Sequence, residues 1–135
     1  MKTTVNSIEL LKIPVVEDTR GNLAFVQKGV LPFEFKRVYY LFDVPSTAFR
    51  GGHSHIVQQE VLIALSGSFE VVLHDGFEKK SFQLNKPNVG LLIPIGIWRE
   101  LQNFSSGAVC LVLASDVFEE ADYIRDFDQF LISKK

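Results

Sequence analysis

Two histidines, His53 and His55, are separated by one residue in a stretch whose neighbours are typical of a β-strand. Because strand side chains alternate between the two faces, both imidazoles are predicted to point to the same face. An imidazole titrates near neutral pH, so such a pair can serve as general acid and base. The alternative, two exposed histidines at the start of a strand, is less expected because the chain has only 3 histidines.

The residues after the pair extend this pattern to a recognisable motif. Glu60 follows His55 after four residues, and Gly67 follows Glu60 after six. This spacing resembles the first sequence motif of the cupin superfamily. The residues that resemble the second cupin motif are Gly90, Pro94, Gly96 and Asn103. The resemblance implies a cupin fold, which hosts many different activities.

Arg99 stands where a metal-binding cupin places its last histidine. A guanidinium only donates hydrogen bonds and stays protonated, so it cannot be a ligand of a divalent cation and would repel one. We therefore expect no metal, and expect Arg99 to stabilise an anionic or anion-developing ligand. Two alternatives stay open: Arg99 pairs structurally with Glu60 or Glu100, or His53, His55 and Glu60 form a weak metal site.

A second polar group precedes the histidines. Alternation places Arg37 and Tyr39 on one strand face and Tyr40 on the other. Tyr39 on the cavity side could bind a sugar oxygen or share a proton, although tyrosines also simply fill β surfaces. Lys36, Arg37 and Arg50 could meet phosphates, or lie at a solvated strand end.

Short β-type runs separated by turn residues must position these side chains. We expect strands at residues 5–16 (broken near Pro14), 22–27, 37–44, 59–66, 68–74, 79–84, 90–93, 99–104 and 108–114. His74-Asp75-Gly76 predicts a hairpin turn. Only residues 118–132 could be helical, as a short helix or an ordered tail. The sequence thus predicts an all-β fold, a jelly-roll barrel being one solution.

Composition excludes several classes. The 135 residues suit one domain, residues 1–135. A single cysteine, Cys110, excludes a disulfide framework, and 14 basic against 16 acidic residues argue against nucleic-acid binding. No apolar run approaches a membrane span and no signal-peptide core is present. We expect a cytoplasmic protein.

Several motifs together resemble the nucleotide-sugar 3,4-ketoisomerases. They are Asp18-x-Arg20-Gly21-Asn22-Leu23, Arg37-Val38-Tyr39-Tyr40, Arg50-Gly51-x-His53-x-His55, Val61 to Ser68, and Asp122 to Asp126. The resemblance implies a cupin that acts on dTDP-4-keto-6-deoxy-D-glucose without metal or other cofactor. It also implies a homodimer with exchanged β-strands and a role in making 3-amino-3,6-dideoxy sugars for surface glycans.

By similarity, His53 is the base at carbon, His55 the shuttle between oxygens, and Tyr39 a support or proton relay; the histidine roles could be reversed. The expected substrate-binding residues are Arg37, Arg50, Arg99, Glu60 and Trp98. Arg99 favours the gluco over the galacto product. Because exposed sheet edges need covering, residues 5–16 are the segment expected to be exchanged between protomers.

Three other functions remain open at this point. They are a metal-dependent cupin isomerase or oxygenase that uses His53, His55 and Glu60, a 3,5-epimerase-like activity on a nucleotide sugar, and a non-enzymatic sugar-binding cupin.

Overall fold

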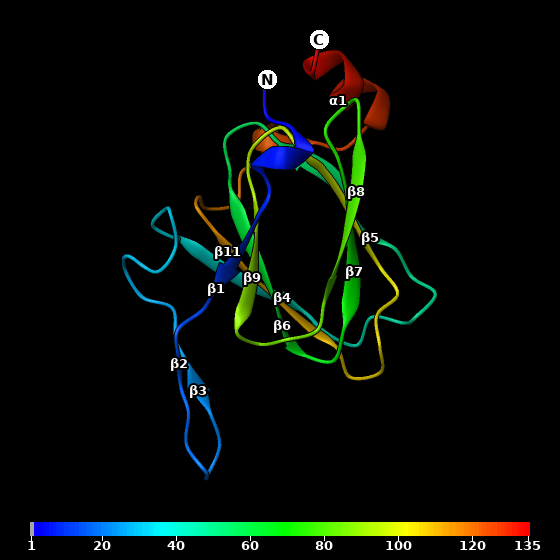
Figure 1. Cartoon of the computed structure of the whole chain (residues 1–135). Helices are drawn as coiled ribbons and strands as arrows, with labels where there is room; N and C mark the ends of the chain where they lie inside the picture. Colours follow the sequence, from blue (N-terminus) through cyan, green and yellow to red (C-terminus); the bar gives the residue numbers. More distant parts are fainter. Residues whose placement is uncertain (1) are drawn as a thin grey trace.

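Two antiparallel five-stranded sheets face each other in the computed structural model, which describes residues 2–135 (Figure 1). The first has the strand order β1-β9-β6-β11-β4. Its strands are β1 (Glu9–Lys12), β9 (Val89–Ile93), β6 (Glu60–Ser66), β11 (Val109–Ala114) and β4 (Arg37–Leu41). The second has the order β12-β5-β10-β7-β8. Its strands are β12 (Tyr123–Ile124), β5 (Arg50–His55), β10 (Trp98–Gln102), β7 (Phe69–His74) and β8 (Lys79–Leu84). This arrangement confirms the predicted all-β, cupin-like barrel.

The central strand β6 is apolar on both faces because both faces are covered. Leu62 and Ala64 point into the core between the sheets, while Val61 and Ile63 join a second apolar cluster. That cluster includes Val26, Val30, Phe33 and Phe35 from the long connection before β4, which covers the outer face of the first sheet. A continuous apolar run is the pattern expected of such a doubly covered strand.

The N-terminal segment differs from its prediction. Residues 5–16 form a 3-10 turn (η1, Val5–Ser7), β1 and the short β2 (Val15–Val16) rather than one broken strand. The strand expected at 22–27 shrinks to β3 (Leu23–Ala24), which pairs only with β2. Figure 1 shows this β2–β3 hairpin projecting from the body.

The C-terminal segment, predicted as a short helix or an ordered tail, contains a short helix preceded by a turn and a short strand. It contains a 3-10 turn (η2, Glu120–Asp122), β12 and the helix α1 (Phe127–Ser133). Asp126 caps α1 by accepting a hydrogen bond from the backbone N–H of Gln129. Phe130 is fully buried and packs with Phe127 against Trp98. None of the helices within residues 2–135 is long and apolar enough to cross a bilayer.

An irregularity in the pairing of β5 with β10 shapes the region around the histidines. Arg99 pairs with His53, but Leu101 pairs with Arg50, so the register shifts between the two. Gly51 lies there with φ +92, and a Cβ at this position would stand 2.7 Å from Leu101 Cδ1. A side chain at residue 51 is therefore disfavoured by both backbone conformation and space.

Candidate active site

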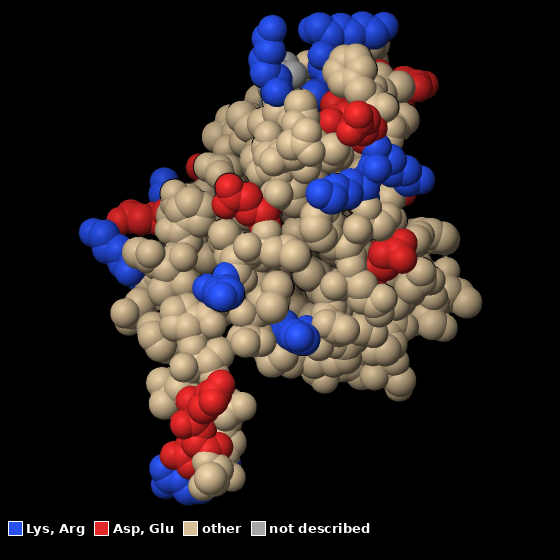
Figure 2. Space-filling model, in the orientation of Figure 1, with Lys and Arg blue, Asp and Glu red and all other residues tan. Residues whose placement is uncertain are grey.

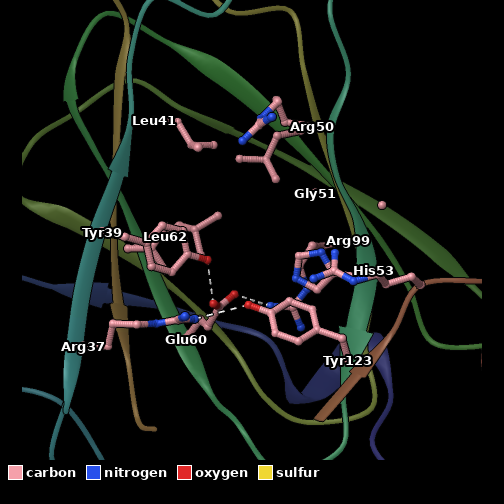
Figure 3. Close-up of a pocket in the computed structure, with 14 residues that line it drawn as sticks. Arg37, Tyr39, Leu41, Arg50, Gly51, His53, Glu60, Leu62, Arg99 and Tyr123 are labelled. Atoms are coloured by element: carbon pink, nitrogen blue, oxygen red, sulfur yellow. Dashed lines mark hydrogen bonds and ion pairs between the residues drawn. The ribbon is translucent and has the colours of Figure 1, made fainter. Parts of the chain in front are cut away.

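A cavity of about 420 Å³ opens between the two sheets. Its walls come from β4, β5, β6, β10 and the β12 segment, and Figure 3 shows their side chains converging on it. The aliphatic part of the lining is Leu41, Leu62, Leu101 and Val112, and polar side chains come from both facing sheets. A hollow in which convergent charged and polar side chains stand beside aliphatic ones can bind and orient a small polar molecule.

His53 and His55 meet at the wall of the cavity that β5 forms. Their Nε2 atoms are 3.2 Å apart, a hydrogen-bond distance, because strand alternation sends both rings to the same face of β5. His53 lines the cavity, whereas His55 is fully buried and lies behind it. The ring of Tyr123 covers both, with centroid distances of 4.9 Å to His53 and 4.4 Å to His55.

Asp122 holds the far side of His55. Its Oδ2 lies 2.8 Å from His55 Nδ1. The same carboxylate accepts hydrogen bonds from the backbone N–H groups of Ile56, Val57 and Gln58. The turn that follows β5 therefore binds the carboxylate firmly, and the carboxylate orients the ring.

Glu60 is the centre of a buried polar network (Figure 3). Its Oε1 accepts a hydrogen bond from the Arg99 guanidinium, and its Oε2 accepts from the Tyr39 hydroxyl at 2.7 Å and from the Gln58 amide at 2.8 Å. Arg99 also donates to the Ile97 carbonyl at 3.0 Å. Since Glu60 and Arg99 are each 1% exposed, the ion pair is shielded from water.

Three more cationic or aromatic groups border the opening. Arg37 donates to the Tyr123 hydroxyl at 3.3 Å and stacks over Tyr39 at 4.8 Å. Arg125 lies over the outer part of the Tyr123 ring at 4.1 Å, and the exposed Arg50 stands on the opposite wall. The cavity therefore favours an anionic ligand.

Burial and nearby cations keep the histidines neutral. Burial first, and then Arg99 and the other cations, lower the pKa of His53 to about 2. The pKa of His55 is also lowered, chiefly by burial and by Arg99, although Glu60 and Asp122 act in the opposite direction. Burial and the Glu60 carboxylate raise the pKa of Tyr39, so its phenol stays protonated. At neutral pH both imidazoles can accept a proton.

Acidification below about pH 6.5 is expected to destabilise the fold through these histidines. The folded-state pKa of His53 lies below its ordinary value of 6.5, so between the two values the unfolded chain binds a proton that the folded chain does not. The stabilisation is complete above 6.5 and decreases as the pH falls. Between pH 7.5 and pH 5, His53 alone should cost about 2 kcal/mol of unfolding free energy, measured by urea denaturation. A His53→Asn variant should lack this part of the pH dependence of the unfolding free energy. An equal pH dependence in the natural chain and the variant would contradict the prediction.

The structure brings most of the predicted site residues together. Arg37, Tyr39, Arg50, His53, Glu60 and Arg99 all line the cavity. Tyr40, predicted on the opposite face, is exposed. Trp98 lies outside the cavity, because it alternates with Arg99 along β10 and packs against α1 instead.

Sequence reasoning assigned no role to Asp122, Tyr123 or Arg125. All three come from the Asp122-Tyr123-Ile124-Arg125-Asp126 stretch, which β12 brings beside β5 through pairing of Tyr123 with His55. The signal was that stretch itself, which carried part of the family resemblance. Its position about 70 residues after the histidines concealed its place in the site.

The possible metal ligands do not form a convincing metal site. The ligand atoms of His53, His55 and Glu60 lie within 4.8 Å of one another. However, both oxygens of Glu60 already accept hydrogen bonds, one of them from the Arg99 guanidinium. A divalent cation there would have to displace these donors and stand beside a fixed positive charge.

Fold and site together define a cupin-type barrel whose cavity holds a neutral histidine pair beside a buried arginine, a site built for proton transfer on an anionic ligand. The chain belongs to the FdtA family (WxcM-like, C-terminal), whose model matches residues 6–135. A curated relative from Aneurinibacillus thermoaerophilus, 40% identical over 123 residues (90% of this chain and 88% of that protein), is a TDP-4-oxo-6-deoxy-alpha-D-glucose-3,4-oxoisomerase.

Two solved structures agree with this membership. The 3,4-ketoisomerase QdtA from Thermoanaerobacterium thermosaccharolyticum, in complex with TDP, is 40% identical with a TM-score of 0.94, and 96% of each chain is covered. The TDP-quinovose 3,4-ketoisomerase WlaRB from Campylobacter jejuni is 43% identical with a TM-score of 0.89, covering 95% of this chain and 99% of that one. The predicted resemblance to the 3,4-ketoisomerases is confirmed.

Proposed function

We propose that the protein isomerises TDP-4-keto-6-deoxy-D-glucose to the corresponding 3-keto sugar. The observation that carries this proposal is the pair of neutral imidazoles, Nε2 to Nε2 at 3.2 Å, at the wall of a cationic cavity. The curated relative acts on this substrate and the QdtA structure holds TDP, which supports the nucleotide as well as the sugar.

The reaction needs one base at carbon and proton exchange between two oxygens. His53, which reaches the cavity, takes the proton from C3 as the C4 carbonyl oxygen gains one, and an enediol forms. The proton then returns to C4 while the C3 hydroxyl loses its own, which leaves the ketone at C3. Atoms and electrons balance within the sugar, so no redox cofactor is required.

Arg99 and Tyr39 are assigned to the sugar oxygens. The Nε atom of Arg99 is a buried donor without a hydrogen-bond partner among the described residues, so it can bind an oxygen on which negative charge develops. The Tyr39 hydroxyl donates a hydrogen bond to Glu60 and keeps lone pairs that can accept from a sugar hydroxyl. His55 lies behind His53 and therefore acts on the substrate only through it.

The diphosphate is assigned to the arginines at the opening. Arg37 keeps a buried Nε without a partner within residues 2–135, and Arg50 is exposed on the facing wall. Guanidinium groups bind phosphate oxygens well because their donors are fixed in a plane.

We further propose that the product has the gluco configuration. Quinovose is 6-deoxyglucose, and the WlaRB relative that is 43% identical acts on the TDP-quinovose series. Arg99 is the residue of this site that we assign to facial control, because it stands beside the hexose in the proposed complex.

Product NMR in deuterated water tests the activity, the position of the ketone and the C4 configuration together. The chain is first treated with a chelator and assayed with TDP-4-keto-6-deoxyglucose. We expect a 3-keto product with deuterium at C4 and undiminished turnover, since no step uses a metal. Recovery of substrate alone would overturn the proposed function, and activity that returns only with added metal would overturn the mechanism.

We also propose a homodimer with exchanged strands. Of residues 5–16, the segment predicted to be exchanged, β1 pairs with β9 of the same chain, so we place the exchange in the projecting β2–β3 hairpin. Within residues 2–135 the two strands pair only with each other, and such an isolated hairpin is marginally stable in water. Val16 and Leu23 expose more than half of their surface. Figure 2 shows charges gathered at the hairpin's end, while the surface nearer the body is largely uncharged. A second copy that received this hairpin would cover the apolar residues.

The dimer is expected to depend on this hairpin. Light scattering at micromolar concentration should give a dimer mass for the natural chain. Charging the apolar surface by Val16→Glu together with Leu23→Glu should shift the mass toward the monomer. A natural chain that is monomeric under these conditions would contradict the proposal.

A further inference from the structure

We propose that Asp122 is a positioning residue that sets the direction of proton transfer in the histidine pair, by fixing His55 in the tautomer with hydrogen on Nδ1. This inference rests on the proposed function. It adds a residue that sequence reasoning did not place in the site, and a path for the proton after it leaves the sugar.

The Asp122 carboxylate can only accept at this position. Three successive backbone N–H groups, those of Ile56, Val57 and Gln58, donate to its two oxygens. With these donors on both oxygens, the carboxylate acts as the acceptor in all three contacts. The fourth contact, 2.8 Å from Oδ2 to His55 Nδ1, must therefore be an N–H that His55 donates.

The N–H on His55 Nδ1 determines which of the other ring nitrogens carry hydrogen. A neutral His55 with hydrogen on Nδ1 has a lone pair on Nε2, the atom 3.2 Å from His53 Nε2. His53 must then carry its hydrogen on Nε2 and donate it to His55. The lone pair of His53 is consequently on Nδ1, for which no partner is found within residues 2–135. His53 thus has a vacant acceptor nitrogen as well as its place in the cavity wall.

The same arrangement moves the positive charge to the imidazole that faces two carboxylates. When His53 Nδ1 takes the proton from carbon, the hydrogen on His53 Nε2 can pass to His55 Nε2. His53 is then neutral again, and the imidazolium is His55, which donates to Asp122 and has the Glu60 carboxylate at 3.7 Å. Return of both protons restores the starting state, so the relay consumes nothing.

The charged groups around the pair favour this location. The titratable and charged groups that face it from the surrounding elements are Asp122 from η2, Glu60 from β6, Arg99 from β10, Arg37 from β4, Tyr123 from β12 and Arg125 after it. Arg99 lowers the pKa of both imidazoles and Arg37 and Arg125 act on His53, but the carboxylates Glu60 and Asp122 raise only that of His55. An opposite charge within a few ångströms stabilises an imidazolium.

An Asp122→Asn variant tests the assignment with little change in shape. Oδ1 accepts from two backbone N–H groups, so the single amide oxygen of asparagine should take that place. Its NH₂ group then faces His55 Nδ1 and donates to it. His55 must then carry its hydrogen on Nε2 and donate it to His53 Nε2. His53 consequently carries its own hydrogen on Nδ1, the atom whose lone pair the proposed mechanism uses to take the proton from carbon. We expect kcat to fall about 100-fold and KM to change less than about threefold.

Asp116→Asn is the matched control. Asp116 lies near the same end of the barrel, but its carboxylate accepts from the Ser115 hydroxyl and has no contact with either histidine. We expect this variant to keep its turnover. Thermal unfolding of both variants shows whether the lost backbone contacts of Asp122 have unfolded the chain at the assay temperature.

Nitrogen-15 NMR of histidine-labelled protein gives a reading that does not depend on activity. The free protein should show His55 protonated on Nδ1 and bare on Nε2, and Asp122→Asn should reverse this. A natural protein with His55 protonated on Nε2 and bare on Nδ1 would overturn the inference. An unchanged kcat in folded Asp122→Asn would also overturn it. The expected tautomers in a protein that leaves the 4-keto sugar unchanged would instead refute the proposed function alone.

Discussion

Replacing His53 by asparagine is expected to lower kcat about 1000-fold while the chain still folds. His53 is the imidazole that lines the cavity, and its neutral state at the assay pH leaves a ring nitrogen free to take the C3 proton in the proposed mechanism. Asparagine retains polar atoms near the ring position but cannot take a proton from carbon. The variant should also fail to exchange C3 hydrogen with deuterated water, which separates loss of the base from a slow later step.

His74→Asn serves as the control for this experiment. His74 is the third histidine of the chain, on β7, where it accepts a hydrogen bond from the Gly76 N–H and packs against Phe127. It takes no part in the cavity, so its replacement should leave kcat near the natural value. Undiminished turnover and C3 exchange in folded His53→Asn would remove His53 from the role of base.

The fold was largely predictable where alternation and turns carry the information. The strand β8 matches its predicted range, residues 79–84, and the hairpin predicted at His74-Asp75-Gly76 joins β7 to β8. Prediction was poorer at the ends of the chain, where strands of two residues form only because a neighbouring strand is present. Local sequence cannot show that Tyr123–Ile124 will pair with β5, since that pairing joins segments far apart in the chain.

The site was predictable in its centre and not at its edge. The period of two along a strand is enough to put His53 beside His55, and Arg37 with Tyr39 on one face. A structural pair of Arg99 with Glu60 was one alternative to ligand binding by Arg99. The structure combines the two, because the paired side chains also line the cavity. Trp98 was expected among the substrate-binding residues, but it adjoins Arg99 on β10, and adjacent strand residues face opposite sides. Asp122 and Tyr123 needed the tertiary structure.

Replacing Arg99 by methionine should reduce both stability and turnover. The guanidinium is the cation paired with Glu60, and both side chains are 1% exposed. Its removal leaves a buried carboxylate without its counter-ion, which costs about 3–5 kcal/mol. In the proposed mechanism it also removes the group that stabilises the developing oxyanion, so kcat should fall about 100-fold or more. Urea unfolding and steady-state kinetics measure the two effects separately.

A second change distinguishes the two roles of Arg99. Glu60→Gln in the Arg99→Met background removes the uncompensated charge, while the glutamine oxygen can still accept from Tyr39 or Gln58. The double variant should regain at least about 2 kcal/mol of the lost stability. Its turnover should stay low, because restoring the fold does not replace the cation beside the sugar. Recovery of both stability and turnover would make Arg99 a purely structural partner of Glu60. The cavity geometry favours the other result, a double variant that is stable but inactive.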